Sequence, residues 1–187
     1  MSLFYTAVFV RKGAQDTAVA RRYPRALDIP ASLWWVCEYG DHYASGLFEG
    51  LEMTPELSAE LGEVILLGLD AANDQLEYEH SRDGQLLRKL TWASDGSQST
   101  WLSVAGEPES WETSVLFSPP RLAHALERLS WQMEDLGADA EWLALESEQV
   151  RACFRAQCYR LAGQVPPGDA YFADLIRRHF GLLLPGD

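Results

Sequence analysis

The chain has 187 residues and a mass of 21.0 kDa, and its composition of 47% hydrophobic and 23% charged residues is ordinary for a globular protein. These fractions exclude a disordered or collagen-like chain. The length predicts a single domain over residues 1–187, large enough to bury a core without metal or cross-links. The formal net charge of −13 argues against nucleic acid and membrane surfaces as direct partners, because both are anionic.

The first third of the chain predicts two strands and a helix. Residues 3–10 and 33–39 are rich in β-branched and aromatic side chains, which is typical of strands. The sequence Thr-Pro-Glu at residues 54–56 is typical of a helix start. Thr can cap the helix, Pro suits its first position and Glu favours its positive end. We expect this helix to extend over about residues 55–68.

The middle of the chain predicts an antiparallel meander over about residues 75–117. Residues 76–81 alternate between apolar and polar side chains, as a half-buried strand does. Asp-Gly pairs at residues 83–84 and 95–96 favour tight hairpin turns between alternating segments. A fourth strand is expected at residues 111–117.

Two-residue turns at both Asp-Gly pairs would fix the register of this meander. They place Glu79 opposite Arg88, which is a favourable cross-strand ion pair. The same count places Leu90 opposite Trp101.

The last third predicts three helices, with a short strand at residues 142–145. Apolar residues recur every three or four positions from Leu122 to Leu136, and Trp131 lies off this stripe and is expected to face away from the core. Strands followed by helices predict an α+β domain. In it, the antiparallel sheet is covered on one face by helices at about residues 55–68, 119–136, 148–162 and 170–180.

The usual catalytic motifs are absent, and no two histidines have the spacing of metal ligands on one helix, so the sequence predicts no catalytic residue, cofactor or metal. Glu38, Asp41 and His42 form the best ionisable cluster, and His80 is a candidate to join it. A histidine beside two carboxylates is the composition of a general base oriented by an acid. A solvated loop at the end of a strand explains the same residues more simply. Tryptophans on the meander, Trp101 among them, indicate either a ligand-binding aromatic face or an aromatic core.

The negative charge is concentrated in one part of the chain. Residues 26–81 contain twelve acidic residues and no Lys or Arg, whereas residues 1–25 contain five basic residues and one acidic residue. Within the acidic segment, five glutamates recur every three or four positions, and the last three share one face of the expected helix. They are Glu49, Glu52, Glu56, Glu60 and Glu63. Arg21, Arg22 and Arg25 would neutralise this stripe if the fold placed them against it.

The leading hypothesis is a non-enzymatic module that presents the acidic surface to a basic protein partner, as an immunity-type inhibitor of a toxin or nuclease would. The alternative is an enzyme or small-molecule-binding domain that uses the aromatic sheet face with Asp41, His42 or His80. A structural subunit of an oligomer is a third hypothesis, and the oligomeric state stays open. Three cysteines without a CxxC pair, together with no signal peptide or spanning segment, favour the cytoplasm.

Overall fold

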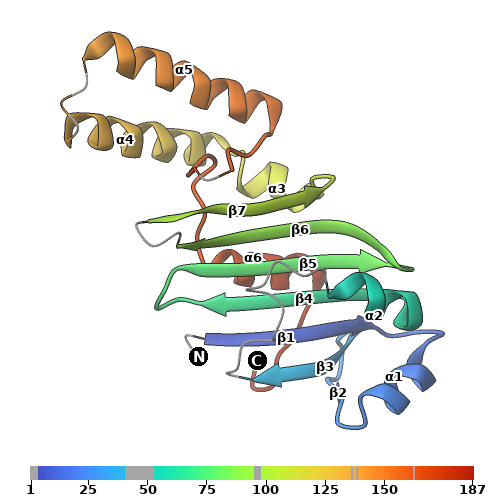
Figure 1. Cartoon of the computed structure of the whole chain (residues 1–187). Helices are drawn as coiled ribbons and strands as arrows, with labels where there is room; N and C mark the ends of the chain where they lie inside the picture. Colours follow the sequence, from blue (N-terminus) through green and yellow to red (C-terminus); the bar gives the residue numbers. More distant parts are fainter. Residues whose placement is uncertain (1–3, 41–52, 95–97, 136, 138, 162) are drawn as a thin grey trace.

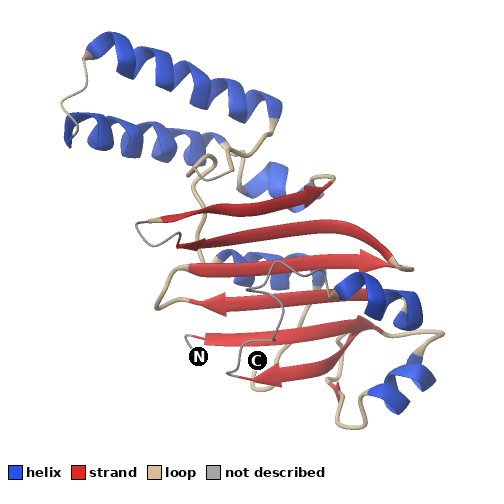
Figure 2. Ribbon diagram, viewed as in Figure 1, coloured by secondary structure: helices blue, strands red, loops and turns tan. Residues whose placement is uncertain are grey.

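The computed structural model describes residues 4–40, 53–94, 98–135, 137, 139–161 and 163–187. It confirms the predicted α+β fold, with a seven-stranded antiparallel sheet and six helices (Figures 1 and 2). The strands are β1 (Phe4–Arg11), β2 (Leu27–Asp28), β3 (Trp34–Gly40), β4 (Glu63–Asp70), β5 (Gln75–Arg82), β6 (Gln85–Ser94) and β7 (Ser99–Gly106). The helices are α1 (Asp16–Arg22), α2 (Thr54–Leu61), α3 (Ser110–Val115), α4 (Pro119–Asp135), α5 (Ala140–Ala156) and α6 (Phe172–Phe180). The strand order is β2-β3-β1-β4-β5-β6-β7.

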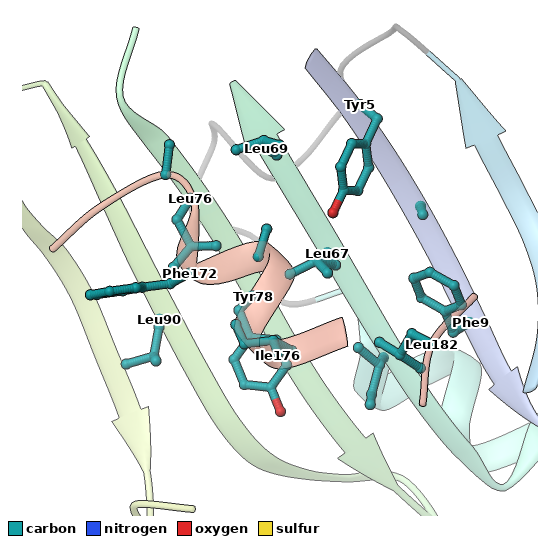
Figure 3. Packing of buried hydrophobic residues seen from close by; sticks show 14 of the residues in the cluster. Tyr5, Phe9, Leu67, Leu69, Leu76, Tyr78, Leu90, Phe172, Ile176 and Leu182 are labelled. Atoms are coloured by element: carbon teal, nitrogen blue, oxygen red, sulfur yellow. The ribbon is translucent and has the colours of Figure 1, made fainter. Parts of the chain in front are cut away.

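Helices cover both faces of the sheet, whereas the sequence predicted cover on one face. On one face, Leu57 and Leu61 of α2 pack on the valines of β1 and on Leu66 of β4. On the other face, Phe172 and Ile176 of α6 pack in the larger core cluster (Figure 3). Successive residues of a strand point to opposite faces, and β1 and β4 are apolar on both, so each face needs its own cover.

Strand β4 occupies residues for which the sequence predicted a helix. The helix expected over residues 55–68 ends at Leu61, and Gly62 adopts a left-handed conformation with φ of 88°. Residues 63–70 then pair with β1 on one side and β5 on the other. The run from Val64 to Leu67 is apolar without a break, which is typical of a central strand as much as of a buried helix. Pairing along both edges decides in favour of the strand.

The predicted hairpin between β5 and β6 forms, but its register differs by one residue. A register shift next to His80 places Arg88 opposite His80 and Lys89 opposite Glu79. The expected pairing of Glu79 with Arg88 was therefore wrong. Glu79 still gains a cation, because Lys89 Nζ lies 3.0 Å from its Oε1.

The second hairpin, between β6 and β7, is also out of the predicted register. Ser94 pairs with Ser99, so the turn is longer than the expected two residues. A further register shift along this strand pair places Leu90 opposite Val104 and not opposite Trp101. The meander ends at β7.

Helix α3 replaces the fourth strand predicted at residues 111–117. The side chain of Glu109 accepts a hydrogen bond from the backbone of Glu112, and the side chain of Glu112 accepts one from the backbone of Glu109. This reciprocal capping box satisfies the free N–H groups of the first turn, so it favours a helix over an extended strand.

Helix α5 begins earlier and ends earlier than the helix predicted over residues 148–162. Its start at Ala140 includes residues 142–145, where the sequence predicted a strand. Asp139 caps this start by accepting a hydrogen bond from the backbone N–H of Trp142. Gln157 adopts a left-handed conformation and ends the helix. Helices α4 and α6 match the predictions for residues 119–136 and 170–180.

Candidate interaction surface

Helices α4 and α5 form a hairpin that extends away from the sheet beyond the β7 edge (Figure 1). They pack against each other through a narrow core of Ala125, Val150 and Phe154. No other described helix or strand covers their outer faces (Figures 1 and 2). The hairpin therefore displays far more surface than its own packing requires.

The base of the hairpin is fixed to the sheet by an aromatic and charged cluster. The Tyr159 ring lies edge-on to Trp101 and to Phe117, with ring centroids 4.9 Å and 5.3 Å away. Its hydroxyl donates a hydrogen bond of 2.5 Å to Glu112. Glu112 in turn accepts two hydrogen bonds, of 2.9 Å and 2.6 Å, from the buried Arg88. This bidentate pair fixes the geometry with which the base of the hairpin attaches to the sheet.

Large apolar side chains are exposed near the tip of the hairpin. Trp131 is 59% exposed, Trp142 44% and Leu145 58%. The prediction that Trp131 faces away from the core is confirmed. Trp142 and Leu145 are three residues apart on α5, so they are neighbours on one helix face. Trp131 lies off the packed stripe of α4, so it points away from the contact between α4 and α5.

The same part of the chain is acidic. Residues 129–150 contain six carboxylates and no Lys or Arg: Glu134, Asp135, Asp139, Glu141, Glu146 and Glu148. Glu146 pairs with Arg160, and Glu148 pairs with Arg155. The other four are exposed, and none has an ion pair among the described residues. The tip therefore combines exposed tryptophans with uncompensated negative charge.

The glutamate stripe predicted as the partner-binding surface does not form one free acidic face. Glu60 receives hydrogen bonds of 2.7 Å from Arg21 and 2.9 Å from Arg22, and these hydrogen bonds lower its pKa. Glu56 is exposed on α2. Glu49 and Glu52 lie outside the described residues.

Glu63 lies on β4 and not on a helix face with Glu60, so that part of the prediction was wrong. Its carboxylate binds His80 Nε2 at 3.1 Å and Arg82 at 2.9 Å. Burial acts to raise the pKa of Glu63, but its hydrogen bonds to His80 and Arg82 outweigh burial and hold it at about 2.

His80, the candidate base, is buried with both ring nitrogens occupied. Its Nδ1 lies 2.5 Å from Glu109 and its Nε2 contacts Glu63. Burial acts to lower the pKa of His80, but the hydrogen bonds to Glu109 and Glu63 raise it above the ordinary value. The two carboxylates therefore stabilise the protonated form of the histidine. Both ring nitrogens are engaged, so neither is left for a substrate. The two contacts instead connect β4 and β5 to the start of α3.

The two other described residues of the predicted ligand site, Glu38 and Trp101, do not come together with His80. Glu38 lies beside Val8 on the face that α2 covers, whereas His80 is on the opposite face of the sheet. Trp101 is fully buried, and its indole N–H donates to the Pro166 carbonyl at 2.6 Å. Asp41 and His42 lie outside the described residues. Trp92 and Trp101 are both buried in the larger core cluster, so the described tryptophans of the meander form an aromatic core and not an exposed binding face.

A second buried polar group lies under α2, and the alternation of β5 is the only signal for it in the sequence. Glu79 accepts hydrogen bonds from the backbone N–H and the hydroxyl of Thr54, both at 3.1 Å. Its neighbour Glu77 receives one hydrogen bond, of 3.1 Å, from Thr91. Burial raises the pKa of Glu77 to about 8. Alternating Glu residues on a strand usually indicate a solvated face, so their burial was not predictable from the pattern.

Comparison with known family models, with curated proteins and with solved structures found no match. Within the described ranges, no group of His, Cys, Asp and Glu side chains could hold a metal ion. In the same ranges, no helix is both long enough and apolar enough to cross a bilayer.

Proposed function

We propose that this protein is a non-enzymatic binding module that presents an acidic surface to a basic protein partner, in the manner of an immunity-type inhibitor. The surface is the tip of the α4–α5 hairpin. The observation that carries the proposal is the exposure of Trp131, Trp142 and Leu145 within a stretch that has six carboxylates and no basic residue.

Exposed tryptophans and carboxylates have different roles in such an interface. Tryptophan is enriched among the residues that contribute most to binding energy, because it buries a large rigid surface. Carboxylates around it attract a cationic partner over long range and raise the association rate. A hairpin that projects from the sheet can enter a groove, such as the one in which a nuclease binds phosphates.

Capture from the native lysate on immobilised full-length protein tests this function. The wild type is compared with Glu141→Lys and Trp142→Ala on the hairpin, and with Glu56→Lys on α2. Glu141 and Glu56 are both exposed and have no ion pair in the described structure, so the two Lys variants make the same change of charge at two sites. We expect a protein of basic composition to be retained by the wild type and by Glu56→Lys, and lost from both hairpin variants.

Salt provides the second criterion. Retention should fall between about 0.05 and 0.5 M NaCl, because the Debye length shortens from above 10 Å to below 5 Å over this range. Capture that survives Glu141→Lys and Trp142→Ala would assign the binding to another surface. Capture that high salt leaves unchanged would contradict the electrostatic role of the carboxylates, and a lysate with no protein retained above blank resin would contradict the proposal itself.

A further inference from the structure

A cavity of about 270 Å³ lies at the base of the hairpin, between α4, α5 and the segment that returns from α5 to the sheet. Leu129, Val150 and Val165 give it apolar walls, and Arg128, Arg160 and Gln164 give it polar ones. Apolar walls with a few convergent polar groups are typical of small-molecule sites. The volume is just below the usual range for drug-sized ligands, so it suits a small one.

Arg128 is the unusual member of this cavity. Arg151 and Arg155 pair with Glu148, and Arg160 pairs with Glu146. Arg128 instead donates a hydrogen bond of 2.7 Å to the side-chain oxygen of Gln164. No carboxylate among the described residues lies within ion-pair distance of Arg128. The positive charge of this partly buried guanidinium therefore has no carboxylate counterion among the described residues.

Gln164 holds this guanidinium in place. Its side-chain oxygen accepts hydrogen bonds from Arg128 and, at 3.3 Å, from Gln132. Its amide group donates to the Gln98 side chain at 3.2 Å and to the Ser99 carbonyl at 3.0 Å. With both ends of its amide engaged, Gln164 fixes one side of the Arg128 guanidinium, a planar fork of donors that lines the cavity. Such a fork matches the two oxygens of a carboxylate.

We propose that this cavity binds a small monocarboxylate with an apolar body, with the carboxylate on Arg128 and the apolar part against Leu129 and Val150. A single negative charge balances the one uncompensated cation, since Glu146 already balances Arg160. A phosphate dianion would exceed that balance and be repelled by Glu146, in a chain of net charge −13. Trp131, Trp142 and Leu145 do not line the cavity, and this inference does not depend on the proposed partner.

Titration of the ¹⁵N-labelled full chain with benzoate and butyrate tests the site, and benzamide and butyramide serve as neutral controls of the same shape. We expect saturable shifts of the Leu129, Gly163 and Gln164 amide signals for at least one carboxylate, and binding at least about tenfold weaker for its amide. Arg128→Gln should weaken carboxylate binding by a similar factor. Arg121→Gln, on the same helix but stacked on Phe172, should leave it unchanged.

Arg128→Lys keeps the charge but loses the fork, so it should give intermediate binding, and it replaces Arg128→Gln if that variant does not fold. The proposal is overturned if neither carboxylate titrates these signals up to about 10 mM, or if the amides bind equally well. It is also overturned if both Arg128 variants bind like the wild type. Tighter binding of inorganic phosphate would overturn the assignment of the ligand class.

Discussion

The sheet and the α4–α5 hairpin depart from the usual distribution of side chains in opposite ways. The sheet buries charged groups beneath its helices, among them Arg88, which pairs with Glu112 of α3, and His80, which contacts the half-buried Glu63. The hairpin leaves 59% of Trp131 exposed, although tryptophan is on average a highly buried residue.

The two departures carry different functional weight. The buried pairs of the sheet have their partners within the chain, so the fold itself accounts for them. The apolar side chains at the hairpin tip stay largely exposed, and the packing of the fold does not account for that exposure. In this molecule an exposed tryptophan is therefore a stronger functional signal than a buried histidine between two carboxylates.

The largest effect should follow from breaking the ion pair beneath the hairpin. Arg88→Met leaves Glu112 charged and fully buried without its partner, which we expect to lower the free energy of unfolding by about 3–5 kcal/mol. Urea denaturation at pH 7 measures it. The double variant Arg88→Met with Glu112→Leu removes both charges and should recover most of the loss. A loss below about 1 kcal/mol in the single variant would mean that the pair does not hold the structure together.

Glu77→Gln should have a smaller effect that depends on pH. Burial raises the pKa of Glu77 in the folded protein to about 8, so folding favours the protonated carboxyl group. The stability that it contributes is present below its ordinary pKa and is lost as the pH rises through about 8. At pH 9 we expect the free energy of unfolding of Glu77→Gln to exceed that of the wild type by roughly 2–4 kcal/mol. At pH 4.5 we expect the two free energies to be equal. Urea denaturation at both pH values decides, and an equal difference at both would contradict the role of ionisation.

His80→Gln tests the buried contacts between His80 and its two carboxylates. Unlike Glu77→Gln, this substitution should lower the free energy of unfolding. The folded pKa of His80 is raised, so its contribution is fully present below the unfolded pKa and is lost as the pH rises through the folded pKa. Glu63 stays ionised at pH 5.5, because its own pKa is held at about 2. We expect the variant to lose about 1–3 kcal/mol at pH 5.5 and less at pH 9. A loss that grows with pH would show that the neutral imidazole is the form that matters.

The fold was predictable where a local pattern agreed with the tertiary context. Strands β1 and β3 follow from their β-branched and aromatic side chains, and the β5–β6 hairpin follows from alternation and the Asp-Gly turn at residues 83–84. Strand β4 did not follow, because Val64 to Leu67 is apolar on every side and only pairing with β1 and β5 selects the extended form. Register was less predictable than pairing, since one bulge beside His80 moves every partner along the strand.

The candidate site was less predictable than the fold, because it depends on which charges meet. The sequence showed both the glutamate-rich segment and the arginines ahead of it, but not that Arg21 and Arg22 reach Glu60. A signal for the hairpin was present in the absence of Lys and Arg over residues 129–150. The strand expected at residues 142–145 concealed it, because on a strand Trp142 would not share a face with Leu145.

The smallest effect on stability should come from a substitution at the exposed tip of the α4–α5 hairpin. Trp142→Ala removes an exposed side chain that belongs to none of the core clusters of the described structure, so we expect its free energy of unfolding to stay within about 0.5 kcal/mol of the wild type. Trp101→Ala, its matched control in the core, should lose about 3–5 kcal/mol. Urea denaturation of both variants measures the contrast. If Trp142→Ala is as stable as expected and still abolishes capture, the tryptophan serves binding and not folding. If Trp142→Ala lowers the free energy of unfolding as much as Trp101→Ala does, Trp142 serves folding, and its exposure no longer supports a binding surface at the hairpin tip.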